Sequence, residues 1–155
     1  MRHRFDDKTV VVSGAAHGFG RCIAETFAQL GTRFGCDLCA AELAETAKAG
    51  VNTEVLDLTD RAAAAAWIAP IEQTTSGAVD VLDDNAGASR SRRCIRSSKC
   101  RTPIGTGFFA VNIVAAFALS RATAAGMKRA GSGRIVNIGS GAGLGPSLTG
   151  IRADR

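Results

Sequence analysis

The sequence predicts an α/β fold built on a doubly wound parallel sheet, with helices on both faces. Short apolar runs of strand length alternate along the chain with segments of helical periodicity. The first run, 9–12, is β-branched throughout, as expected of a parallel strand that is buried on both faces. Glycines follow this run at Gly14, Gly18 and Gly20, where the chain turns from the strand into a helix. These observations together predict a three-layer α/β/α domain.

Each element is predicted from a local pattern. A helix follows the first strand because Ile23, Phe27 and Leu30 recur at helical spacing, and Gly31 is its expected C-cap. Further helices are expected at 40–49, at 61–74 and, in a long apolar run, at 108–130. The remaining strands are expected at 32–36, 52–58, 79–82 and 133–140. We expect the five parallel strands to lie in the order 3-2-1-4-5, joined by right-handed crossovers.

Length and charge narrow the functional classes. The 155 residues predict one domain, 1–155, with a net charge of +5. Six of the 19 basic residues lie in an acid-free basic loop, 88–107, which leaves 13 basic against 14 acidic residues elsewhere. The charge therefore belongs to one loop, and we expect no general nucleic-acid-binding surface. No 18-residue apolar run and no signal-peptide pattern occurs, so we expect a cytoplasmic protein without a membrane partner.

The glycine-rich turn after the first strand predicts a phosphate-binding loop. Glycines allow the backbone to approach a diphosphate, and the free N–H groups and dipole of the following helix favour its negative charge. The spacing is Gly-x-x-x-Gly-x-Gly, which resembles the Thr-Gly-x-x-x-Gly-x-Gly motif of the short-chain dehydrogenase/reductase family, with Ser13 in place of threonine. The resemblance implies a Rossmann-like fold and an NAD(P) cofactor bound by Ser13, Gly14, His17, Gly18, Phe19 and Gly20.

Two acidic positions extend this expected cofactor site. Asp37 ends the second strand, where a carboxylate would bind a ribose hydroxyl and repel a 2′-phosphate, so NAD is expected rather than NADP. The alternative for Asp37 is a solvated cap of the next helix. Asp57 and Leu58 match the family's adenine-contacting pair, while the same segment also offers Thr59 or Asp60 as an N-cap.

The turn after the fourth strand also matches the family. Asn85, Ala86 and Gly87 fit the family's Asn-Asn-Ala-Gly pattern, in which the turn supports the sheet and lies against the cofactor. Asp84 stands where the family has the first asparagine. We expect a buried carboxyl at this position to need a hydrogen-bond donor.

The resemblance assigns two residues to catalysis. Asn112, in Val-Asn-Ile on the long helix, matches the asparagine that holds a water of the family's proton relay; a structural asparagine paired in the core is the alternative. Ser140, after the fifth strand, matches the catalytic serine that binds the oxygen of an alcohol or carbonyl substrate. Relatives form oligomers through the helix at 108–130, so a homo-oligomer is expected.

The family's catalytic tyrosine and lysine have no counterpart here. The chain contains no tyrosine, and its tail, 150–155, departs from the family where Tyr-x-x-x-Lys should begin. We therefore expect a C-terminally truncated, inactive oxidoreductase whose fifth strand is an exposed edge. The alternatives are a nucleotide-binding module or subunit that pairs with an intact relative, and a polyanion-binding protein that uses the loop at 88–107. We interpret that loop as an out-of-frame translation; the alternatives are a disordered, solvated loop and a phosphate- or RNA-binding insertion.

Overall fold

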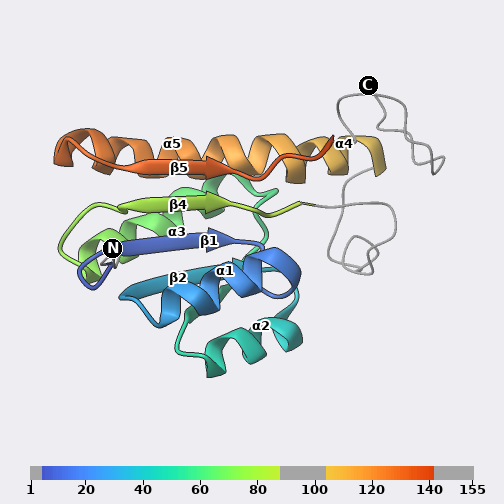
Figure 1. Cartoon of the computed structure of the whole chain (residues 1–155). Coiled ribbons are helices and arrows are strands. Elements are labelled where there is room, and N and C mark those ends of the chain that lie inside the picture. Colours follow the sequence, from blue (N-terminus) through green and yellow to red (C-terminus); the bar gives the residue numbers. More distant parts are fainter. Residues whose placement is uncertain (1–4, 88–103, 142–155) are drawn as a thin grey trace.

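The computed structural model describes residues 5–87 and 104–141, which form a parallel sheet flanked by helices (Figure 1). Its strands are β1 (Thr9–Ser13), β2 (Thr32–Asp37), β3 (Asn52–Val55), β4 (Val81–Asp84) and β5 (Arg134–Asn137). They lie in the order β3-β2-β1-β4-β5, and every adjacent pair is parallel. The predicted doubly wound class and strand order are confirmed. Residues 88–103 of the basic loop and the tail at 150–155 lie outside the described residues.

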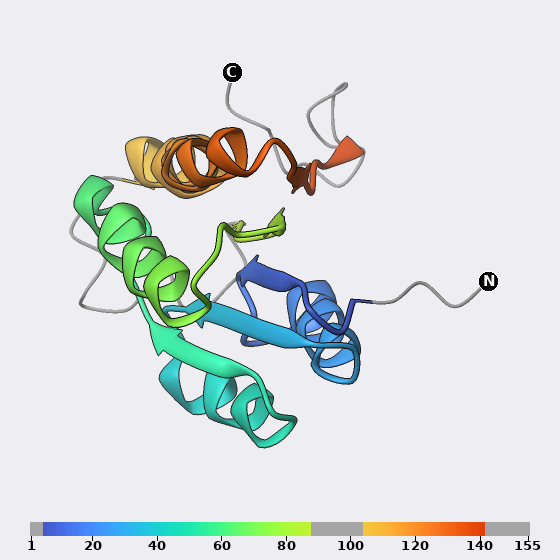
Figure 2. The ribbon, with the colours of Figure 1, turned by 90° about the vertical axis from the view of Figure 1, so that its left-hand side faces the viewer.

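Helices cover both faces of the sheet (Figure 2). On one face, α1 (Gly18–Ala28) and α2 (Ala40–Lys48) pack with Val10 and Val12 of β1. On the other face, α3 (Arg61–Thr74) and α5 (Ala115–Ala130) pack with Val11. Successive strand side chains point to opposite faces, so the apolar run at 9–12 supplies two cores at once.

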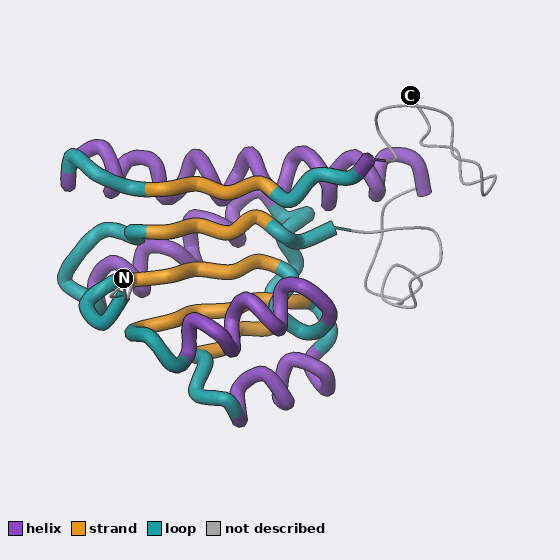
Figure 3. The backbone as a smooth tube through the Cα atoms, viewed as in Figure 1, coloured by secondary structure: helices purple, strands orange, loops and turns teal. Residues whose placement is uncertain are grey.

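The strands lie side by side (Figure 3), and the arrows of Figure 1 all run in one direction, so the carboxyl ends meet at one edge of the sheet. All five residues of the central strand β1 are buried, whereas the four residues of β5 are exposed. The prediction of an exposed fifth strand is therefore confirmed. Ile135 and Val136 are among its exposed apolar side chains.

The fourth strand lies two residues later than predicted. It was expected at 79–82 but comprises Val81–Asp84, paired with β1 from Val10 onward. The carboxylate of Asp80 accepts hydrogen bonds from the backbone N–H of Thr9, at 2.9 Å, and from Nζ of Lys8, at 2.7 Å. These bonds hold Asp80 beside the start of β1, and regular pairing with β1 begins at the next residue, Val81. As a result, Asp83 and Asp84 lie inside the sheet, not in the turn that follows it.

Three other predicted ends are corrected by neighbouring contacts. The third strand stops at Val55, before the turn at Asp57, and the fifth stops at Asn137 because β4 ends opposite it. The first helix ends at Ala28 with Gln29 as its C-cap, so Gly31 is not the cap. Gly31 has a different role, because a Cβ there would overlap the carbonyl oxygen of Phe5.

The long helix begins earlier than predicted and is not uniform. It starts with α4 (Ile104–Phe109), continues as a π-helix (Ala110–Val114) and ends as α5. Phe109, Ile113 and Phe117 are exposed at a spacing of four residues, which places them along one side of the helix. By length and composition alone, the run Gly107–Ala130 could cross a membrane, with 17% of its most apolar window buried.

Two carboxyl groups are buried in β4. Asp83 is 6% exposed and Asp84 is 4% exposed. The hydroxyl of Ser120 donates to Oδ2 of Asp84 at 3.1 Å, which supplies the expected donor. Oδ1 of each aspartate has no hydrogen-bond partner in the described part of the chain. Burial raises the pKa of Asp84 to about 7, opposed by the Ser120 hydrogen bond and reinforced by the charge of Asp83.

We predict that Asp84→Asn stabilises the protein at pH 8. The folded protein keeps a proton on Asp84 that the unfolded chain releases near its ordinary pKa of 3.8, so stability falls between about pH 4 and pH 7 and is lowest above pH 7. An amide removes this penalty, and we expect the melting temperature at pH 8 to rise by about 4 °C or more. Near pH 4 the parent protein and Asp84→Asn should have the same melting temperature.

The matched control is Asp7→Asn, at an exposed position, which should leave the pH profile of the melting temperature unchanged. Some pH dependence remains in Asp84→Asn because burial also raises the pKa of Asp83. A melting temperature at pH 8 equal to or below that of the parent protein would contradict the prediction.

Candidate active site

The glycine loop lies at the carboxyl edge of the sheet, between β1 and α1 (Figure 1). Gly14 has φ of 70° and Gly18 has φ of 58°, which is the left-handed region that favours glycine. A Cβ on Gly14 would lie 2.9 Å from Cα of Ala86, so Gly14 allows the loop to pack against the turn after β4. A Cβ on Gly18 would meet nothing within 4 Å. The loop is therefore packed at one end and open at the other.

The start of α1 closes onto this loop through Gly20. A Cβ there would overlap the carbonyl oxygen of Gly14 and Nδ2 of Asn85. The backbone N–H groups of the first helical turn, which begins at Gly18, have no acceptors within the helix. They can bind an anion where the loop is open. His17 is the N-cap of the helix, and the side chain of Phe19 is exposed beside it.

Ser13 connects the loop to the turn after β4. Its buried hydroxyl oxygen accepts hydrogen bonds from the backbone N–H groups of Asn85, at 3.1 Å, and Ala86, at 2.9 Å. In return, Nδ2 of Asn85 donates to the carbonyl oxygens of Ser13, at 3.3 Å, and Gly14, at 3.2 Å. The structure thus brings together Ser13, Gly14, Gly20, Asn85 and Ala86.

Asp37 joins the glycine loop to the start of α2. Its Oδ2 accepts from the N–H of Ala16 at 3.1 Å, and its Oδ1 accepts from the N–H of Cys39, the N-cap of α2, at 3.0 Å. Part of the capping alternative is therefore present. Each carboxylate oxygen can accept a further hydrogen bond, so these contacts leave capacity for a ribose hydroxyl.

The residue pattern did not predict one cationic side chain of the loop, Arg21. The guanidinium of Arg21 donates to the carbonyl oxygens of Ala16 and of Glu42 in α2, the latter at 2.7 Å. The hydroxyl of Thr46 donates to the carbonyl oxygen of Ala15 at 2.8 Å. The only sequence signal for Arg21 is its place directly after the last glycine of the motif, because both acceptors are backbone atoms. The two side chains fix the side of the loop that faces α2.

Asp57 and Leu58, the two residues expected to contact adenine, lie in different environments. Oδ1 of Asp57 accepts from the N–H and the hydroxyl of Thr59, at 2.9 and 2.7 Å, and so forms a turn. Asp60 is the N-cap of α3 and accepts from the N–H of Ala62. Leu58 is 8% exposed and packs in the core against α3. The capping alternative is confirmed for Asp60, and a contact of Asp57 or Leu58 with adenine stays a prediction.

Asn112 lies in the π-helix and reaches the turn after β4. Its Nδ2 donates to the carbonyl oxygen of Phe108 at 2.9 Å, and a Cβ on Gly87 would lie 3.1 Å from its Oδ1. Gly87 therefore allows the turn to approach this amide. Asn112 is exposed, so the alternative of a buried core asparagine is wrong. Single-turn π segments are frequent at functional sites, and the residue pattern gave no sign of this one.

Ser140 follows β5 at the same edge of the sheet and is exposed. The N–H of Ile138 donates to the carbonyl oxygen of Asp84 at 3.0 Å, which extends the strand pairing just beyond β5. The carboxyl edge thus carries both the glycine loop and the two residues expected to act in catalysis. In the described residues, no group of three or more His, Cys, Asp or Glu side chains could hold a metal ion.

Comparisons with known proteins bear on the family of this chain. The family model for short chain dehydrogenase matches residues 8–151. The chain is 30% identical over 140 residues to the 3-oxoacyl-acyl-carrier-protein reductase FabG of Escherichia coli, covering 88% of this chain and 56% of FabG. It is 34% identical over 154 residues to the short chain dehydrogenase andC of Emericella variicolor, covering 94% and 57% of the two chains.

A solved structure shows the same fold. A metagenomic short-chain oxidoreductase in complex with NADP superposes with a TM-score of 0.75 at 28% identity, covering 94% of this chain and 68% of that one. The chain spans little more than half the length of the two curated relatives. The family match includes the glycine loop, the turn after β4 and the strand before Ser140, and the chain belongs to the short-chain dehydrogenase/reductase family.

Proposed function

We propose that this 155-residue polypeptide binds NAD(P) at the glycine loop and does not, by itself, catalyse the family's reaction. The observation that carries the proposal is the closure of the loop around Gly14 and Gly20 with open space at Gly18. This shape leaves room for a diphosphate beside Gly18, in the space that a side chain at this position would occupy. The amide of Asn85 and the hydroxyl of Ser13 hold the loop in this shape.

The residues fit the cofactor in a definite division of roles. The N–H groups at the start of α1 would hold the diphosphate, Asp37 a ribose, and Asp57 with Leu58 the adenine. When bound, the nicotinamide supplies or accepts a hydride. Ser140 would bind the oxygen of a small alcohol or carbonyl substrate, and Asn112 would hold a water between that oxygen and solvent.

Asp37 favours NAD over NADP in this proposal. Its carboxylate already binds the loop through Ala16 and the start of α2 through Cys39, so its position is fixed. A fixed negative charge at the ribose would repel a 2′-phosphate. The NADP found in the solved relative is a property of that protein.

The proposed lack of activity rests on the residues that the chain contains. A phenol titrates near pH 10, and the family lowers that value with a nearby lysine to transfer a proton near neutrality. No tyrosine occurs in the 155 residues. Asn112 and Ser140 can position a substrate and a water, but neither is a general acid or base near pH 7.

The exposed side of the long helix supports a second part of the proposal. Phe109, Ile113 and Phe117 expose apolar surface along one side of it. We propose that this surface packs against a second copy of the chain or an intact relative in a cytoplasmic oligomer. This arrangement also explains how the run Gly107–Ala130 can be apolar without lying in a bilayer.

We predict that Gly18→Ala weakens NADH binding at least about tenfold, a loss of roughly 1.4 kcal/mol of binding free energy. The added methyl group enters the open end of the loop. The matched control is Gly50→Ala, because Gly50 also has positive φ, 87°, and open space around it, but lies after α2. NADH fluorescence measures binding, and thermal melting should show a similar loss of stability in both variants. Equal NADH affinity in the two variants would refute the loop as the binding site.

We predict that NADH binds at least about tenfold more tightly than NADPH, and that Asp37→Ala reduces this ratio to about threefold or less, because the repulsion of the 2′-phosphate is removed. Separate titrations with NADH and with NADPH, each followed by its own nicotinamide fluorescence, measure the ratio. Asp57→Ala serves as the control, since its carboxylate turns toward Thr59 and should not change the ratio. Tighter binding of NADPH to the unaltered chain would overturn the assignment of Asp37.

We predict no turnover above background with NADH or NADPH and a panel of small ketones, or with NAD and small alcohols. Absorbance at 340 nm measures the rate, and FabG of Escherichia coli with its own substrate is the positive control. Ser140→Ala should leave the background unchanged, because the 155 residues contain no tyrosine to transfer the proton. A rate within about 100-fold of a typical enzyme of roughly 10 per second would show that another group replaces the tyrosine.

A further inference from the structure

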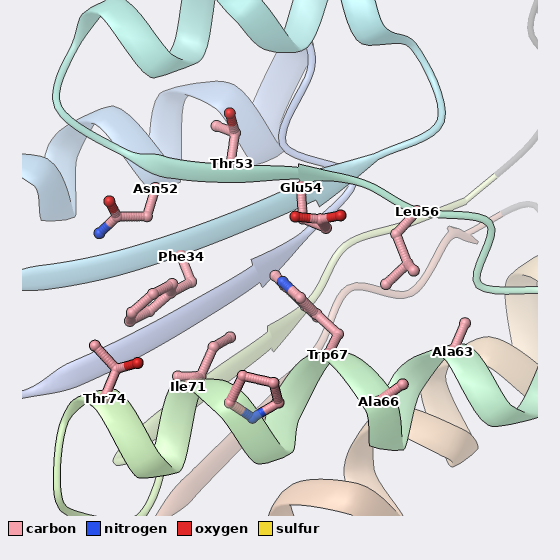
Figure 4. Close-up of a pocket in the computed structure, with 11 residues that line it drawn as sticks. Phe34, Asn52, Thr53, Glu54, Leu56, Ala63, Ala66, Trp67, Ile71 and Thr74 are labelled. Carbon is pink, nitrogen blue, oxygen red and sulfur yellow. The ribbon is translucent and has the colours of Figure 1, made fainter.

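A pocket lies on the side of the sheet, between the edge strand β3 and α3 (Figure 4). Its volume is about 430 Å³, which is within the range of small-molecule sites. Phe34 from β2 contributes to it, together with Trp67 and Ile71 from α3. No residue of the glycine loop lines it, so the pocket is separate from the cofactor site.

The pocket exists because α3 presents small side chains to the edge strand. Ala63 and Ala66 lie where larger residues would fill the space beneath β3. Pro70 also lines the pocket and has no N–H to donate to the carbonyl oxygen of Ala66, one helical turn earlier. The helix therefore leaves open volume beside β3.

Strand pairing directs Glu54 into this space. Asn52 pairs with Phe34 and Glu54 pairs with Cys36, so these four residues share the face that is covered by α3. Figure 4 shows Glu54 pointing from β3 toward the indole of Trp67. Within the described chain, no basic side chain forms an ion pair with Glu54. Its negative charge thus faces a lining that is otherwise largely aromatic and aliphatic.

The floor of the pocket is well packed, since Trp67 is 8% exposed and Ile71 is 4% exposed. A carboxylate above buried aromatic groups attracts a cation with an apolar body, because the rings also attract positive charge. A neutral apolar ligand would remove water from Glu54 without replacing its hydrogen bonds, and an anion would be repelled by it. Charge and lining therefore favour one ligand class.

We propose that this pocket binds a small organic ammonium ion, with its charged group at Glu54 and its apolar part against Trp67 and Phe34. Such a site gives the protein a ligand-binding function independent of the cofactor loop.

The protein carries its own probe for this test. Trp67 is the single tryptophan and the chain has no tyrosine, so intrinsic fluorescence reports on the pocket. We use 2-phenylethylammonium as the probe cation and 2-phenylethanol as its neutral analogue. We expect a saturable change in Trp67 fluorescence with the cation and binding of the alcohol at least about tenfold weaker, or roughly 1.4 kcal/mol. Equal binding of the two compounds, or no saturable change, would overturn the proposal.

Variants of the same chain locate the charge. Glu54→Gln keeps the size of the side chain and should weaken binding of the cation by about fivefold or more, because a charged partner is lost. The control is Glu45→Gln, an exposed residue of α2 that pairs with Lys48, which should leave the affinity unchanged. Unchanged cation binding in Glu54→Gln would overturn the proposal.

A third variant fills the pocket. Ala66→Leu adds volume at an exposed helix position and should weaken the binding of both the cation and the alcohol. Thermal melting checks that the variant keeps the fold. NADH titration of Glu54→Gln should match the unaltered chain, which separates this site from the cofactor site. Full cation affinity in Ala66→Leu would show that the fluorescence change arises outside the pocket.

Discussion

The hydroxyl of Ser13 is the contact on which the carboxyl edge of the sheet depends. Its oxygen accepts hydrogen bonds from the N–H groups of Asn85 and Ala86. In return, the side-chain amide of Asn85 donates to the carbonyl oxygens of Ser13 and Gly14. Two adjacent parallel strands, β1 and β4, are thereby joined just beyond the end of their ladder. The shape of the glycine loop follows from this connection, because Gly14 and Gly20 pack directly on the residues that it fixes.

The same sheet contains buried ionisable side chains whose charged forms are destabilised by burial. Arg33 in β2 is 2% exposed, and none of its guanidinium nitrogens has a hydrogen-bond partner in the described residues. Burial lowers its pKa, and burial raises those of Asp83 and Asp84. Buried charges without partners are costly. The strands on either side of β1 therefore carry a penalty that the apolar residues of β1 and its covering helices must offset.

Much of the fold was predictable because its signals are local. The apolar run at 9–12 and the helical spacing of Ile23 and Phe27 each indicate an element and the side on which it packs. Strand ends were less predictable, since they depend on distant partners. Asp80 binds Thr9 and Lys8 at the start of the neighbouring strand, and β4 begins after it, two residues later than predicted. The end of β4 in turn sets the end of β5. The π-helix around Asn112 likewise left no pattern in the residues.

By itself, the sequence determined the class of fold, the strand order, the glycine loop and the absence of a tyrosine, because these depend on residue type and spacing along the chain. Only the tertiary structure decided that Ser13 and Asn85 hold the loop, that Arg21 supports it, and that Glu54 faces a pocket beneath an edge strand. The physical reason is that these contacts join residues far apart in sequence, and many of their acceptors are backbone atoms that every residue possesses.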